Sequence, residues 1–179
     1  MFKGENQIWK DILSFLQTKI SELGFSDWRV VQFQQPTMQE LESKTVYVSW
    51  IGSRRIGWQK HTQILVNNAM KQYEGYVEEI RFQVSAYKQR SLNDDTATPT
   101  SSDLINRLTT FLQSQAGVKA LRAIGYSTPR IVDVRQNPIT TDSDLYEKMP
   151  SVDISVFLVQ NEIADIASTD DFNLTTKGI

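Results

Sequence analysis

The sequence predicts an α+β fold in which an antiparallel or mixed β-sheet packs against an N-terminal and a central helix. Two observations carry this prediction. Apolar side chains recur at helical spacing near the N-terminus and again near the middle of the chain, and segments of alternating apolar and polar residues lie between and after them. Helices separated by runs of strands favour a sheet with antiparallel neighbours.

The first helix is predicted over residues 7–23. Its apolar stripe consists of Ile8, Ile12, Phe15, Leu16, Ile20 and Leu23. Gly24 stands where a left-handed C-terminal cap is expected. A strand is predicted over residues 28–33, and Pro36 is expected to open a turn or a short helix before Thr45.

Residues 45–51 are predicted to form a strand, because β-branched and aromatic residues dominate them. Trp50 is in phase with Val46, so we expect Trp50 in the core. The glycine-bounded residues 52–57 are expected to form a loop, after which residues 58–66 return as an antiparallel partner of the first strand.

The clearest alternation predicts a long strand over residues 76–87 with one apolar and one mainly polar side. Its apolar side is formed by Tyr76, Glu78, Ile80, Phe82, Val84 and Ala86. Small polar residues over 89–103 indicate an inserted loop that ends in a helix cap at Ser101 or Ser102.

The central helical stripe comprises Leu104, Leu108, Phe111 and Leu112. Residues 115–117 are expected to break or bend this helix, and a further helical segment ends at Gly125. A strand is predicted over 130–135, followed by a turn-rich link through Pro138 and a last strand over 152–159.

We expect residues 1–160 to form a single α+β domain and residues 161–179 to form an extended C-terminal arm, because the last segment has little periodicity and several turn formers. No apolar run approaches the roughly 20 residues that span a bilayer. The N-terminus also lacks a basic segment followed by an apolar signal core. The sequence therefore predicts neither secretion nor a membrane anchor.

Composition argues against several kinds of chemistry. The chain has no cysteine and one histidine, which excludes disulfides and the usual zinc ligand sets. A net charge of -2 argues against tight nonspecific DNA binding. The acidic clusters lack the calcium-loop pattern, and neither a hydrolase elbow nor a dinucleotide fingerprint occurs. We expect no enzyme, with no catalytic, cofactor-binding or metal-binding residues.

Gly52 and Gly57 have the spacing of a phosphate-binding loop, but Trp58 and Gln59 stand where that loop needs a lysine and a hydroxyl. The neighbourhood combines positive charge with an aromatic surface. The candidates for an interface or a channel lumen are therefore Arg54, Arg55, Trp58 and Lys60. Whether they meet a protein surface or passing DNA stays open. We expect His61 to be a structural or a surface residue.

A metal-dependent nuclease is a further alternative. The tripeptide Glu42-Ser43-Lys44 fits the acid-x-Lys element of a nuclease motif, but Thr37 stands where the second carboxylate is expected.

Three segments together resemble the phage neck or tail terminator proteins. They are VYVSWIGSRRIGWQ, SSDLINRLTTFLQSQAGVKALRAIG and RIVDVRQNPITTDSDLYEKMPSVDISVFL, which lie within residues 45–160. The resemblance implies a tail-terminator-like α+β subunit that forms a homohexameric ring at the head-proximal end of the tail tube. Such a ring stops tube polymerisation and offers a docking surface for the filled head.

The resemblance implies a structural virion protein of the neck that is assembled in the host cytoplasm. Its implied partners are further copies of the chain, head-side connector or adaptor proteins, the tail tube protein and genomic DNA in transit. Residues 89–103 and 161–179 are candidates for contacts between subunits or with the neighbouring connector layer. A head-closure or connector adaptor of the same neck is the first alternative, ahead of a nucleic-acid-binding module and the nuclease.

Overall fold

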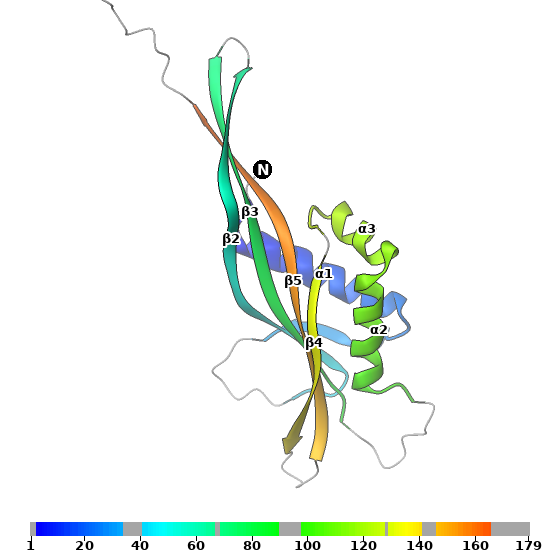
Figure 1. Cartoon of the computed structure of the whole chain (residues 1–179). Helices are drawn as coiled ribbons and strands as arrows, with labels where there is room; N and C mark the ends of the chain where they lie inside the picture. The colour runs from blue at the N-terminus through cyan, green and yellow to red at the C-terminus, as the bar shows by residue number, and fades with distance from the viewer. Residues whose placement is uncertain are drawn as a thin grey trace, which may run out of the picture.

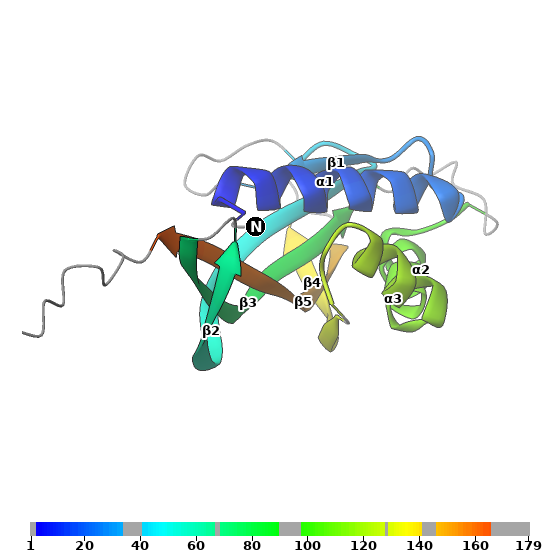
Figure 2. The ribbon, with the colours of Figure 1, turned by 90° about the horizontal axis from the view of Figure 1, so that it is seen from above.

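The structure is a computed structural model that describes residues 3–33, 41–66, 69–89, 98–127, 129–140 and 146–165. In these residues three helices lie on one face of a five-stranded sheet (Figures 1 and 2). The strand order is β1-β2-β3-β5-β4; β1 and β2 pair in parallel, and the other neighbours are antiparallel. The predicted α+β fold with a mixed sheet is confirmed.

Helix α1 (Glu5–Glu22) confirms the predicted N-terminal helix. Its buried stripe is Ile8, Trp9, Ile12, Phe15, Leu16 and Ile20. Each such side chain contributes roughly 1.5–3 kcal/mol by leaving water. Gly24 follows with φ +94°, the left-handed conformation expected of a cap that ends the helix. Strand β1 (Arg29–Gln32) then pairs with the start of β2, whereas the turn expected at Pro36 lies outside the described residues.

Strand β2 (Thr45–Val66) is continuous, so the predicted loop over residues 52–57 and the returning strand over 58–66 are wrong. Its antiparallel partner is β3 (Ala69–Tyr87), which contains the predicted long strand and begins earlier. The two glycines occupy irregularities inside β2, where the pairing register shifts between Trp50 and Gly52 and again between Ile56 and Lys60. A bulge and a turn both favour glycine, and this similarity explains the error.

Helices α2 (Ser101–Gln113) and α3 (Gln115–Ala123) form the predicted central helical region. The cap of α2 is Thr100, so the predicted cap at Ser101 or Ser102 is wrong by one or two residues. Thr100 forms a reciprocal capping box with Asp103. The break predicted at residues 115–117 occurs one residue earlier, at Ser114, and residues 115–117 are the first turn of α3. The Ser114 hydroxyl accepts from the Gly117 N–H at 3.1 Å and donates to the Phe111 carbonyl at 2.6 Å.

Strands β4 (Arg130–Thr140) and β5 (Tyr146–Asp165) contain the last two predicted strands and are longer than predicted. The turn-rich link predicted through Pro138 is wrong at that residue, because Pro138 lies in β4 and pairs with Lys148 of β5. Residues 141–145, where the rest of the link was expected, lie outside the described residues. The boundary at residue 160 stays a prediction: β5 continues to Asp165, and residues 166–179 are not among the described ones.

The hydrophobic core lies between the helices and one face of the sheet. The sheet contributes Val46, Val48, Ile80, Phe82, Val84, Ala86, Val152, Ile154, Val156 and Leu158. Trp50 is only half-buried but packs against this core, 5.7 Å from Trp9 and 5.2 Å from Phe82 between ring centroids. No helix of the described residues is long and apolar enough to cross a bilayer.

Candidate functional site

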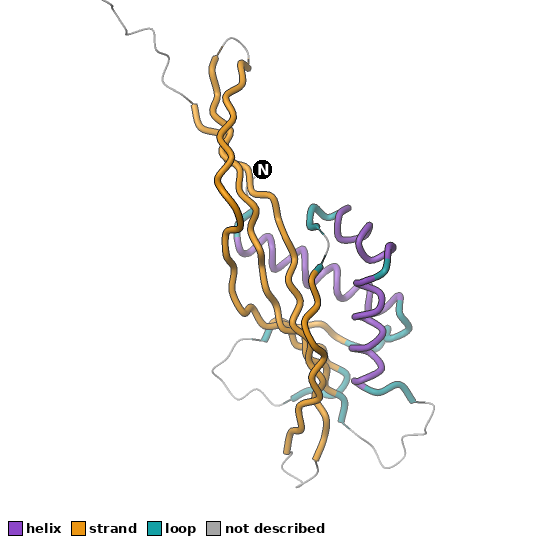
Figure 3. Tube along the Cα trace, in the orientation of Figure 1, coloured by secondary structure: helices purple, strands orange, loops and turns teal. Residues whose placement is uncertain are grey.

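Strands β2, β3 and β5 extend well beyond the helices at one end of the molecule (Figures 1 and 3). We call residues 56–66, 69–77 and 159–165 of these strands the projecting sheet, which begins at the first exposed row beyond the core. Its two edges lack a neighbouring strand among the described residues: β1 pairs with β2 only as far as Val48, and β4 pairs with β5 only as far as Ser155. An isolated bridge from Tyr126 to Leu158 is the last described pairing at the β5 edge.

A bulge interrupts the β2 edge of the projecting sheet. Ile56 pairs with Val77 and Lys60 pairs with Gly75, so three residues of β2 lie opposite the single residue Tyr76. The first of the three, Gly57, has φ +76°, a conformation that favours glycine. The second, Trp58, is 97% exposed. Burial of a tryptophan side chain is strongly favourable, so Trp58 is a candidate anchor for a binding partner.

Side-chain contacts hold both ends of the bulge. Before the bulge, the Arg55 guanidinium lies 4.2 Å from the centre of the Tyr76 ring. In the last residue of the bulge, Gln59 Nε2 donates a hydrogen bond to Glu74 Oε2 at 2.7 Å. Trp58 is therefore presented from a held backbone, which lowers the conformational entropy that a partner must remove on binding.

Arg54 is also engaged within the hairpin, because its Nε donates to Oε2 of Glu79 on the opposite strand. Glu79 is only 3% exposed. Its burial alone raises the pKa of the carboxyl, but hydrogen bonds from Arg54 and Ser155 outweigh burial, so the pKa lies below its usual value. Binding of Arg54 to a phosphate would leave a buried carboxylate without its partner.

An apolar row crosses the projecting sheet beside this ion pair. Ile56, Val77 and Val159 pair in register across the three strands and are 37, 36 and 57% exposed. Paired residues project to the same side of a sheet. The buried neighbours Ile80 and Leu158 are an odd number of residues away, so the row lies on the face opposite the helices.

The four sequence candidates thus differ in their surroundings. Arg54 and Arg55 contact Glu79 and Tyr76 within the hairpin, Trp58 is fully exposed, and Lys60 is exposed opposite Gly75. Neither the row nor Glu79 was predicted from the sequence. Val77 and Val159 alternate with buried residues of their strands, but only the register of the sheet aligns them with Ile56.

The alternative catalytic candidates lie apart from this surface. His61 Nδ1 is 3.4 Å from Glu74 Oε1 and 3.2 Å from Gln72 Nε2, a contact within the hairpin. In the nuclease-like tripeptide, Glu42 pairs with Arg29 at 2.8 Å and Lys44 pairs with Asp27 at 2.5 Å. Within the described ranges, no three His, Cys, Asp or Glu side chains are grouped as metal ligands would be.

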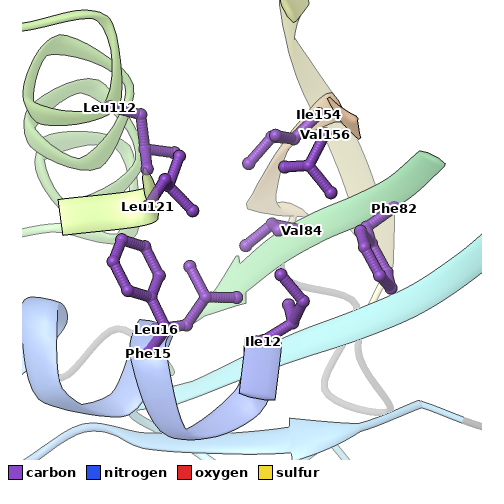
Figure 4. A pocket seen from close by; sticks show the side chains of 9 residues that line it. All are labelled: Ile12, Phe15, Leu16, Phe82, Val84, Leu112, Leu121, Ile154 and Val156. Atoms are coloured by element: carbon purple, nitrogen blue, oxygen red, sulfur yellow. The ribbon is translucent and has the colours of Figure 1, made fainter. Parts of the chain in front are cut away.

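A small gap lies in the core between α1, the sheet and the ends of α2 and α3 (Figure 4). Its volume is about 20 Å³, and its lining is wholly apolar: Ile12, Phe15, Leu16, Phe82, Val84, Leu112, Leu121, Ile154 and Val156. A buried water needs two to four polar partners, which this lining does not supply. The gap is a packing defect and offers no group for catalysis.

The model of one protein family, described as E217 gateway protein gp29, matches residues 7–163. This range covers more than half of the chain, from helix α1 through most of the projecting sheet. A search of curated proteins found no match.

Proposed function

The chain belongs to the E217 gateway protein gp29 family, and from this premise we propose that it is a structural protein of the neck of a tailed bacteriophage. The match supports a component of the virion that acts at the junction of head and tail by binding other proteins. A structural role of this kind needs contact surfaces and no catalytic site.

Within the neck, we propose that the chain is a tail terminator subunit that forms a ring, caps the tail tube and joins it to the head connector. The observation that carries an assembly role is the projecting sheet, with two edges free of described strands and a tryptophan held outward on a bulge. Subunits of a ring meet through two different surfaces, so both sides of each subunit must bind.

The proposed partners are further copies of the chain, the tail tube protein and the head-side connector or adaptor proteins, with genomic DNA passing through the ring. Two features support transit of DNA rather than retention. The chain has a net charge of -2, and Arg54 and Arg55 already contact Glu79 and Tyr76.

The first alternative is a head-closure or connector adaptor of the same neck. A phage that lacks this chain would distinguish the terminator role from the adaptor role. A stop codon in this gene should give particles that electron microscopy can sort. Loss of a terminator leaves tube polymerisation unchecked, so tails longer than normal that carry no head are expected. Supply of the intact chain from a plasmid should restore normal tails and joined particles.

Loss of an adaptor gives a different result, namely tails of normal length beside filled heads that do not join. That outcome would contradict the terminator role but keep the role in the neck. Normal infectious particles without the chain would contradict both.

A further inference from the structure

We propose that Trp58 of one copy docks on the Val159 end of the apolar row of a second copy, so that the projecting sheets of successive copies join head to tail. The inference deepens the proposed function and rests on it, because it names the surfaces through which the neck subunits meet.

The argument begins with the position of the two apolar groups. Trp58 lies on the β2 edge, in the bulge opposite Tyr76, and Tyr76 pairs across the sheet with Gln160. Val159, the neighbour of Gln160, lies on the β5 edge. The two exposed side chains thus lie at nearly the same level on opposite edges of the same three strands, which are about 10 Å apart from first to last.

A second copy fits this arrangement better than other occupants. Each copy carries both halves of the contact, one on each edge, so a contact made at one edge leaves the other half available for the next copy. Repetition of such a contact closes into a ring when the rotation between copies allows it. A partner at only one edge would leave the other apolar group in water.

The surroundings of the row have the composition of a protein interface. The exposed row of Ile56, Val77 and Val159 is bordered by the ion pair of Arg54 with Glu79, which is the next row of the sheet. Interfaces combine an apolar centre containing an aromatic anchor with a polar rim. The side chains carry the contact, because the bulges in β2 disturb the regular row of N–H and C=O groups that strand addition requires.

The surroundings of Trp58 favour a protein contact over stacking on DNA. Stacking platforms combine aromatic rings with cations that are free to follow the backbone. Here both neighbouring arginines have partners within the hairpin. DNA binding by Trp58 remains an outcome that the experiment can reveal.

The test uses the full chain with Trp58→Asp, Val159→Asp and the control Val134→Asp, in analytical ultracentrifugation over a range of concentrations. Val134 is 36% exposed, like the members of the row, but lies on β4. Wild type and the control are expected to self-associate equally. Each of the other two variants should raise the dissociation constant at least tenfold, with an unchanged circular dichroism spectrum.

Mixing the two variants then tests the head-to-tail arrangement. It also shows that the variants are folded, because only folded copies can form mixed dimers. A pair of one Trp58→Asp copy and one Val159→Asp copy has one intact contact, formed by the tryptophan of the second and the row of the first. We expect the equimolar mixture to form mixed dimers, whereas each variant alone and the double variant stay monomeric.

Self-association of both variants at the wild-type dissociation constant would overturn the inference and leave the proposed function intact. The absence of mixed dimers would also overturn it. If Trp58→Asp weakens binding of a labelled single-stranded DNA but not self-association, the tryptophan serves nucleic acid instead. A wild type that stays monomeric at high concentration would count against the proposed ring itself.

Discussion

The side-chain amide of Gln160 binds both backbone polar groups of Lys3. The Lys3 N–H donates to Gln160 Oε1 at 2.9 Å, and Gln160 Nε2 donates to the Lys3 carbonyl at 3.0 Å and to Glu78 Oε2 at 3.1 Å. The Lys3 ammonium in turn lies 2.6 Å from Asp11 Oδ2. The chain before α1 is therefore fastened to β5 at the base of the projecting sheet.

Replacement of this buried amide tests how much its hydrogen bonds to Lys3 contribute to the free energy of unfolding. Gln160 is 1% exposed. Gln160→Ala leaves backbone groups of Lys3 without partners, so we expect the free energy of unfolding to fall by about 2 kcal/mol. Urea denaturation measures the change. Asn161→Ala, at the exposed neighbouring position, should change it by less than about 0.5 kcal/mol. Equal changes in the free energy of unfolding at the two positions would show that the hydrogen bonds of Gln160 do not stabilise the fold.

Removal of residues 161–179 should leave a folded subunit that assembles less well. The core residues of β5 and Gln160 all precede the cut, whereas residues 161–165 of β5, which pair with β3, are lost. Thermal unfolding followed by circular dichroism reports the fold, and light scattering reports association. A chain that ends at residue 157 also lacks Leu158 and Gln160, and it should unfold at a lower temperature. If the chain that ends at residue 160 is also unfolded, the removed residues 161–179 belong to the core and the prediction is wrong.

Gly117 allows α3 to approach the end of α2 closely. A Cβ atom added there would lie 2.1 Å from the Phe111 carbonyl oxygen and 2.9 Å from the Leu112 Cα, and backbone atoms cannot move aside without shifting a helix. Gly117→Ala is therefore expected to cost about 2–3 kcal/mol in the free energy of unfolding. Gln115→Ala, at an exposed position of the same helix, should be neutral or slightly stabilising. A stabilising Gly117→Ala would contradict this packing.

The ion pair of Arg54 with Glu79 predicts sensitivity to acid. The pKa of Glu79 in the folded chain lies below its ordinary value of 4.5, so its contribution to stability is present above that value and lost as the pH falls through the folded pKa. Between about pH 5 and pH 3, wild type should lose more stability than Glu79→Gln, which cannot titrate. Urea midpoints at each pH give the comparison. Parallel loss in both chains would show that Glu79 is not the titrating group.

Local sequence pattern was sufficient for the elements that bury one regular face. The stripe of α1 and the alternation from Ile80 to Ala86 both predict the face that the core uses. These elements follow from their own residues, because the hydrophobic period is set by helix or strand geometry. The approximate ends of the helices were predicted as well, since caps are local.

Pairing between distant segments limits what a single sequence can predict. The residues around Gly52 and Gly57 have the composition of a turn, and only their pairing with Arg81 and Val77 to Gly75 shows that they are bulges in one strand. The apolar row was not predicted for the same reason. Ile56, Val77 and Val159 are unremarkable in sequence, and they become one surface only through the register of three strands.

The measurement that tests the central claim most directly is electron microscopy of the purified full chain at high concentration, with masses from sedimentation of the same sample. A neck ring subunit is expected to give closed rings with a central hole and a mass that is a whole multiple of 20.5 kDa. Particles of a single 20.5 kDa chain at every concentration would contradict assembly through the projecting sheet.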